Sequence, residues 1–318
     1  MSRSRLLRYV LRRLVGLAAA LVLVSVATFF MIHLVPGDPV RSSLGLTATH
    51  ELVVQRTHTL GLDQPIPQQF WHFMTNLVHG QLGTSIHSQE PVSQIISSRL
   101  PKSAELAVGA LALTVLLAIP LGILAGAATA HSRRKNLETV FNGGTGLVAA
   151  VPEYLMAVLL AYLLAVKTHL LPVAGAGDGW RSYVLPTVCI ALGPIAVLAR
   201  LVRVQTLNVL NQDYVRTARA KRLPARVVYA RHALPNLLTA AMTVGGLLFA
   251  SLIGGSVIVE NVFAWPGLGS EVVQSIQAHD YPVIQGIVLV LASAVVIINA
   301  LVDILLAVVD PRSAIAGD

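Results

Sequence analysis

Residues 14–35 read LVGLAAALVLVSVATFFMIHLV, an apolar run that contains no Asp, Glu, Lys or Arg. A helix needs about 20 such residues to cross the roughly 30 Å hydrocarbon core of a bilayer. Helix is the expected conformation, because an isolated strand would leave its backbone N–H and C=O groups unpaired in lipid. The run therefore predicts a membrane-spanning helix.

Five more apolar runs of comparable length follow this one. We expect six spans in all, at about 14–35, 104–130, 139–166, 183–201, 237–260 and 284–309. Only 12% of the residues are charged and 55% are hydrophobic, whereas soluble domains carry about 25% charged residues. The sequence predicts an all-α integral membrane protein with six transmembrane helices.

The first span has an alternative interpretation as a cleaved signal peptide. Five arginines precede it, and Ser25-Val26-Ala27 loosely resembles a signal-peptidase site. The apolar region of a signal peptide is 7–15 residues long, whereas this run continues to Val35. We therefore expect an uncleaved membrane anchor.

Basic residues fall unevenly on the two sides of the membrane. Of the 23 Lys and Arg residues, 17 lie on the side that carries the N-terminus, the loop around 133–135, the 200–236 loop and the tail. The positive-inside rule makes that side cytoplasmic. We predict a multi-pass protein of the cell membrane, inner or plasma, with both termini in the cytoplasm. Short basic loops can contact membrane lipid but form no soluble basic face for nucleic acid.

The spans divide the chain into five parts. These are a cytoplasmic N-terminus at 1–13, the first transmembrane helix at 14–35, an extracytoplasmic segment at 36–102, a core with five transmembrane helices at 103–310, and a cytoplasmic tail at 311–318. We call 36–102 the external segment. The core includes a pair of short helices expected at 211–235.

Sequence motifs for several enzyme and metal-site classes are missing. The sequence has no G-x-x-x-x-G-K-[ST] phosphate loop, no H-E-x-x-H and no G-x-S-x-G. Its single cysteine, Cys189, lies in an apolar run and can form neither an intrachain disulfide nor a cysteine metal site. We expect no catalytic residue, no metal site and no cofactor in this chain.

The 200–236 loop carries eight of the basic residues. Asp213 is a plausible N-cap for a helix that continues to Lys221, and Leu223-Pro224 ends that helix. A second helix is expected at 225–234, before Pro235.

This loop has two interpretations. Basic residues can simply enforce topology and touch anionic lipid. That role does not require two broken helices with small residues among the arginines, as at 216–220. A docking surface does, because small residues permit close approach and arginines pair with carboxylates of a partner.

Seven stretches together resemble a known family. They are 213–221 with 232–236, LVPGDP at 34–39, GLDQP at 61–65, LGTS at 82–85, FAWPGLG at 263–269, DYPVIQG at 280–286 and DPR at 310–312. In this order and spacing they are similar to the membrane permeases of ATP-binding-cassette importers, in the dipeptide, oligopeptide and nickel branch. The resemblance covers almost the whole chain and implies the type I importer permease fold.

Two positions depart from that family pattern. Arg222 stands where the family has glycine, at the joint between the two short helices, and glycine would permit a positive φ there. Gln81 stands where an acidic residue is usual.

The resemblance implies a set of partners. They are a homologous second permease, two ATP-binding subunits that hold ATP and Mg, and an extracytoplasmic substrate-binding protein. The implied residues for ATPase docking are Asp213, Tyr214, Arg216, Thr217, Ala218, Arg219, Lys221, Arg222, Arg226, His232, Leu234 and Pro235. This chain would form half of the path for di- and oligopeptides, without itself being an enzyme. Nickel, glutathione, haem or another small solute remain alternative substrates of the same class.

Candidate path residues are polar or helix-breaking positions in otherwise apolar spans. They are Asn142, Pro152, Glu153 and Ser256. An ion-coupled secondary transporter is the remote alternative, but it would need paired acidic residues or broken helices in two related halves. An intramembrane enzyme would need a catalytic constellation within the spans, and the sequence shows none.

Overall fold

The computed structural model describes residues 3–33, 39–44, 49–59, 61–130, 135–221 and 256–309. It also describes residues 224, 227, 245, 246, 248, 249, 251, 252 and 254. Over these residues the regular structure is helical, and the one β-contact is an isolated antiparallel bridge between Thr84 and Pro91. The predicted all-α class is confirmed for the described residues.

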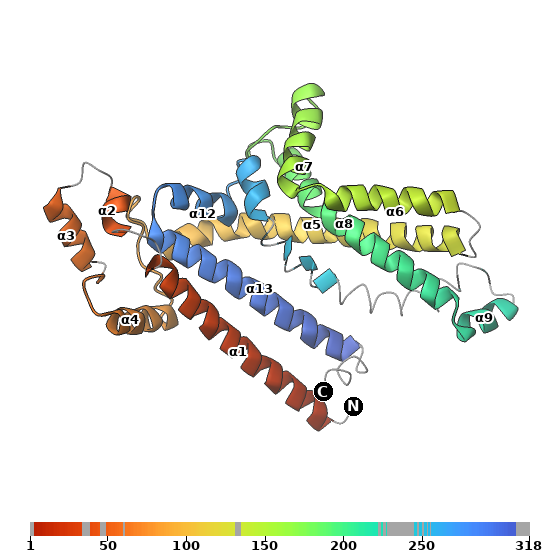
Figure 1. Ribbon diagram of the computed structural model, residues 1–318, viewed down its shortest axis with the longest axis horizontal. Coiled ribbons are helices and arrows are strands. Elements are labelled where there is room, and N and C mark those ends of the chain that lie inside the picture. Colours follow the sequence, from red (N-terminus) through yellow and green to blue (C-terminus); the bar gives the residue numbers. More distant parts are fainter. Residues whose placement is uncertain are drawn as a thin grey trace.

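Four long apolar helices dominate the fold (Figure 1). They are α1 (Arg3–His33), α5 (Val92–Thr129), α8 (Trp180–Leu210) and α13 (Tyr281–Val309). Each is long and apolar enough to cross a membrane. They correspond to the spans predicted at 14–35, 104–130, 183–201 and 284–309. Helix α5 begins well before its predicted span, because its first turns are polar and hydropathy alone does not reveal them.

The third predicted span, 139–166, is not one continuous helix. The structure has α6 (Lys135–Ala150), α7 (Glu153–Leu160) and a π-helical extension, η2 (Ala161–Lys167). The two arms meet at an angle of 98°. Pro152 explains the break, because it has no N–H to donate and it disfavours helical geometry at the residue before it.

The fifth predicted span, 237–260, lies largely outside the described residues. Residues 256–262 are helical, and a short loop joins them to α12 (Leu268–Gln277). The described part of the chain thus contains four candidate spans, or five if the bent pair counts as one.

The core of the molecule forms between α5 and α8. Gly122 and Gly126 of α5 permit close approach, because a Cβ at Gly122 would lie 2.6 Å from the Ala199 carbonyl oxygen, and one at Gly126 would lie 2.7 Å from Thr206 Cβ. Small residues at helix contacts are typical of membrane proteins. Helix α6 packs along the same pair.

Helix α1 packs mainly on α13, and the two run side by side in Figure 1. Two polar contacts join them. Gln285 Nε2 donates to the Thr28 carbonyl at 3.2 Å, and Arg13 pairs with Asp303 at 2.9 Å. These contacts lie toward opposite ends of the helix pair, so they fix how α1 lies along α13.

The external segment contains α2 (Pro39–Leu44), α3 (His50–Thr59) and α4 (Ile66–Val78). Its last part is tied to the beginning of α13 by buried Asp280. That carboxylate accepts hydrogen bonds from Ser85 Oγ at 2.5 Å and from the Ile86 N–H at 3.2 Å. The external segment is therefore attached to the core at a specific point.

Candidate functional site: coupling helix, cavity and external loop

Helix α9 (Asp213–Ala220) follows α8 directly, and Asp213 lies in its first turn. A carboxylate at that end complements the partial positive charge of the helix N-terminus. The Val215 N–H donates to the Gln212 carbonyl at 3.1 Å, and the Lys221 N–H donates to the Thr217 carbonyl at 3.0 Å. The first predicted short helix is thus present, with Asp213 within it.

One face of α9 is buried against its own chain. Val215 and Ala218 are buried with Val209 and Leu210 of α8, close to Ile123 of α5. Ala218, a predicted docking residue, therefore faces α8 of its own chain. Tyr214, Thr217 and Lys221 are exposed and form the outer face. Figure 1 shows α9 beyond the end of α8, projecting from the long helices.

The other predicted docking residues are described in part or not at all. Arg216 and Arg219 lie on α9 by their backbone, and their side chains are outside the described part of the chain. The remaining residues fall outside the described ranges altogether. They are Arg222, Arg226, His232, Leu234 and Pro235.

Arg203 joins three helices near the base of α9. Its side chain is 7% exposed, its Nε donates to Thr129 Oγ1 of α5 at 3.3 Å, and its guanidinium pairs with Glu138 of α6 at 2.8 Å. A buried arginine of this kind is held by its partners, because an unpaired buried charge is strongly unfavourable. In the sequence Arg203 had appeared only as one more topology-setting charge.

A cavity of about 310 Å³ lies at the bend between α6 and α7. Glu153 lines it at the start of α7, and Pro152 immediately precedes Glu153. Cys189 and Gly193 of α8 line the opposite wall. Because the break leaves backbone groups without helical partners, the cavity combines polar groups with an apolar lining.

The four predicted path residues do not come together at this cavity. Asn142 is exposed on α6, and Ser256 is buried away from the cavity lining. Glu153 and Pro152 are at the cavity or directly beside it.

Sequence reasoning missed Glu260, which is fully buried. Its Oε2 accepts hydrogen bonds from the Gly269 N–H at 2.6 Å and the Ser270 N–H at 3.4 Å. These are free donors at the start of α12, where a carboxylate is favourable. The sequence feature that could have indicated this site is the pair of glycines at 267 and 269. In the structure neither glycine has room for a Cβ beside Glu260.

The same external loop is tied to α5. Trp265 Nε1 donates to the Lys102 carbonyl at 3.1 Å, and the Leu268 N–H donates to Ser103 Oγ at 2.8 Å. Trp265 also packs edge-on against Tyr183 of α8, with ring centroids 4.5 Å apart. The loop at 263–269 therefore locks α12 onto the ends of α5 and α8.

Lys102, Glu105 and Tyr183 form a polar cluster beside that loop. Lys102 Nζ lies 3.2 Å from Glu105 Oε2 and 3.3 Å from the Tyr183 hydroxyl, and that hydroxyl donates to Glu105. Glu105 lies within α5, about four turns of helix after its start at Val92. Both charged residues are partly exposed.

Comparison with known proteins covers nearly the whole chain. Residues 118–315 match the family described as binding-protein-dependent transport system inner membrane component, and residues 6–107 match the N-terminal family of such components. Glutathione transport system permease protein GsiC of Pectobacterium atrosepticum is 39% identical over 307 residues, covering 96% of this chain and 98% of the relative. Its counterpart from Salmonella typhimurium is 39% identical over 306 residues, with the same coverage. The Escherichia coli K12 protein is 37% identical over 306 residues, also with that coverage.

These matches agree with the helical architecture and with the motifs at 213–221 and 263–269. The chain belongs to the inner-membrane components of binding-protein-dependent transport systems, the permease subunits of ATP-binding-cassette importers.

Proposed function

We propose that this permease forms half of the path for small peptides, glutathione included, and receives force from an ATPase through α9. The observation that supports this proposal is that α9 has one buried face and one exposed face. Val215 and Ala218 fix it to α8, while Tyr214 and Thr217 are exposed. A helix attached on one face and open on the other can transmit the motion of a partner to the spans.

Arg203 gives that motion a route into the core. Displacement of α9 acts directly on α8, and Arg203 connects α8 to Thr129 and Glu138. Nucleotide binds more tightly to one conformation of the ATPase than to the other. Its binding therefore shifts the ATPase, and with it the permease, between inward- and outward-facing states. The partners of this system are a second permease, two ATP-binding subunits and a binding protein that meets the external segment.

The docking role is tested by charge reversal on α9 and at the joint that follows it. In the assembled complex, Arg219→Glu with Arg222→Glu is expected to reduce substrate-stimulated ATP hydrolysis to the unstimulated rate, because like charges would oppose a carboxylate-bearing partner. The measurement is ATPase activity with and without loaded binding protein.

A matched control makes the same charge change in the other cytoplasmic loop, with Arg133→Glu and Arg134→Glu. Both double variants should insert into the membrane normally. Normal stimulation in the α9 variant would rule out docking through this segment.

The substrate proposal rests on the relatives, whose names specify glutathione transport. Glutathione is itself a small peptide, so the relatives favour peptides over nickel, haem or an oligosaccharide. Uptake of labelled glutathione should be lost in a strain lacking this chain and restored by its expression, and di- to tetrapeptides should be tested as competitors. Unchanged uptake of both glutathione and peptides would exclude a peptide substrate and leave the family assignment intact.

A further inference from the structure

Helix α4 carries no Asp, Glu, Lys or Arg, although it belongs to the segment expected outside the membrane. At about 100° per residue its apolar side chains fall within an arc of roughly 160°. They are Ile66, Phe70, Trp71, Phe73, Met74, Leu77 and Val78. The polar side chains occupy the rest of the helix surface. Helix α4 is thus strongly amphipathic without being charged.

Among the described residues, only one edge of this apolar arc is seen to be covered. Phe70 and Phe73 pack on Phe29 of α1, with ring centroids 5.2 and 5.6 Å apart. At the other edge Trp71 is 70% exposed and Val78 is 84% exposed. These two residues form an exposed apolar stripe.

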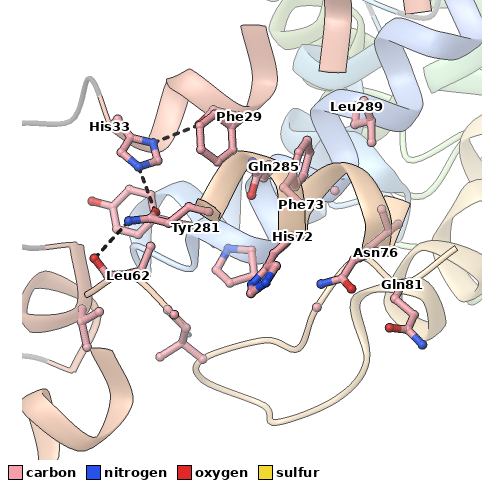
Figure 2. Close-up of a pocket in the computed structure, with 18 residues that line it drawn as sticks. Phe29, His33, Leu62, His72, Phe73, Asn76, Gln81, Tyr281, Gln285 and Leu289 are labelled. Carbon is pink, nitrogen blue, oxygen red and sulfur yellow. Dashed lines mark hydrogen bonds between the residues drawn. The ribbon is translucent and has the colours of Figure 1, made fainter. Parts of the chain in front are cut away.

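The polar side of α4 faces a pocket of about 180 Å³ between α1, α4 and α13. Figure 2 shows His72 and Asn76 at this pocket, together with Tyr281 and Gln285 of α13. Gln69 fixes the helix there, because its Nε2 donates to the carbonyls of Leu62 and Gln64. Trp71 and Val78 lie about 100–180° around the helix from Gln69, His72 and Asn76, on the side away from the pocket.

The contact with α1 fixes the depth of α4. The apolar window of α1 is Leu11–Met31, 21 residues, which is about 31 Å of helix and matches the hydrocarbon thickness. Phe29 is two residues inside the outer end of that window, and its neighbour Phe30 is exposed. Helix α4 packs on Phe29, so its contact with α1 lies near this end of the apolar window.

We propose that α4 lies in the lipid–water interface on the side of the external segment, with Trp71 and Val78 immersed in lipid. Helix α1, on which α4 packs, also has exposed apolar side chains, among them Val22, Leu23 and Phe30. Tryptophan is enriched at this level of the membrane, and amphipathic helices lie there with their apolar faces buried about 5–10 Å. The lack of charge removes the cost of placing α4 at that depth.

This placement gives the external segment a second support. Asp280 fixes its last part to α13, and α4 would fix its middle part to the membrane. The pocket that contains His72 and Asn76 would then open toward the extracytoplasmic space at a set height above the bilayer. The inference concerns how the segment is held, and it does not depend on the substrate proposed above.

Site-directed spin labelling tests the placement. Trp71→Cys and Val78→Cys report on the apolar stripe, and His72→Cys and Asn76→Cys are matched controls at exposed positions on the pocket side of the same helix. The full-length chain with its co-purifying subunits is reconstituted in nanodiscs of phosphatidylethanolamine and phosphatidylglycerol. The single native cysteine, Cys189, is buried, and the parent protein measures its background labelling.

The measurement compares two collision rates for each spin label. One is with oxygen, which partitions into lipid, and the other is with a nickel chelate, which stays in water. Labels at 71 and 78 should favour oxygen by several-fold relative to the labels at 72 and 76, which should favour the chelate. Water-like values at all four positions would overturn the proposal. Protection of 71 and 78 from both reagents would overturn it as well, and would indicate a protein partner on the stripe. Elution of each labelled complex as a single species shows that it is assembled.

Discussion

At the residue scale, Glu260 explains why a glycine-rich loop has its particular sequence. A fully buried carboxylate needs donors, and the N–H groups of Gly269 and Ser270 supply them. Glycine at 269 permits this close approach, because a Cβ there would clash with the Val257 Cα and would lie 2.8 Å from Glu260 Oε2. Carboxylate and glycine therefore depend on each other, and the start of α12 is held by both.

We expect Glu260→Ala to lower the thermal midpoint of the purified complex by several degrees. The change leaves buried donors at Gly269 and Ser270 without an acceptor, which costs about 1–3 kcal/mol. Gly269→Ala should act in the same direction by overpacking. Gln274→Ala, an exposed change on the same helix, is the control and should have little effect. An unchanged midpoint for Glu260→Ala would contradict the role assigned to this carboxylate.

At the element scale, Arg203 joins three helices, and a movement of one of them would carry the other two. Arg203, Thr129 and Glu138 lie on α8, α5 and α6. Their separation in the sequence explains why pattern analysis could not pair them. Helix propensity and hydropathy describe each span by itself, and side-chain pairing across spans depends on how the helices cross.

Arg203→Met is expected to lower the amount of substrate taken up per ATP hydrolysed. Methionine keeps much of the buried volume but removes both polar links, so α9 would move α8 without moving α5 and α6. Uptake and hydrolysis measured together in proteoliposomes give this ratio. Arg200→Met, a less buried position one turn earlier, is the control. A ratio equal to that of the parent would show that Arg203 is not part of the transmission.

The same scale shows which helices the sequence could predict. Continuous apolar runs correctly indicated α1, α5, α8 and α13, because burial in lipid selects for length and hydropathy. The bend at Pro152 was underestimated. Proline loosens a helix in any case, and whether the result is a kink or a 98° break depends on what packs around it.

At the scale of the whole molecule, the cavity at that bend is the strongest candidate for a section of the transport path. It brings together Glu153 of α7 and the wall of α8 around Gly193. The helix is broken beside Glu153, as the sequence suggested, whereas Asn142 and Ser256 do not line this cavity, and their part in the path stays a prediction. Polarity in an apolar span marks a constrained position without saying what the constraint is.

Gly193→Trp is expected to reduce uptake at least several-fold while leaving the basal ATPase rate intact. A Cβ at Gly193 meets open space, so a large side chain there can enter the cavity. Gly193→Ala is the matched control and should transport normally, because it adds little volume and favours helix. Uptake at the parental rate in Gly193→Trp would place the path elsewhere.

The pairing of α1 with α13 has a mechanical consequence. Two contacts, Thr28 with Gln285 and Arg13 with Asp303, hold α1 and α13 together as one rigid pair. We call this pair of helices the rod. A helix of about 30 residues is roughly 45 Å long, so a tilt of about 10° would swing its far end by about 8 Å. The rod carries the external segment at that far end. Under the proposed function this rod is a lever, and a small rotation at the end that carries Arg13 would displace the external segment far enough to open or close a protein contact.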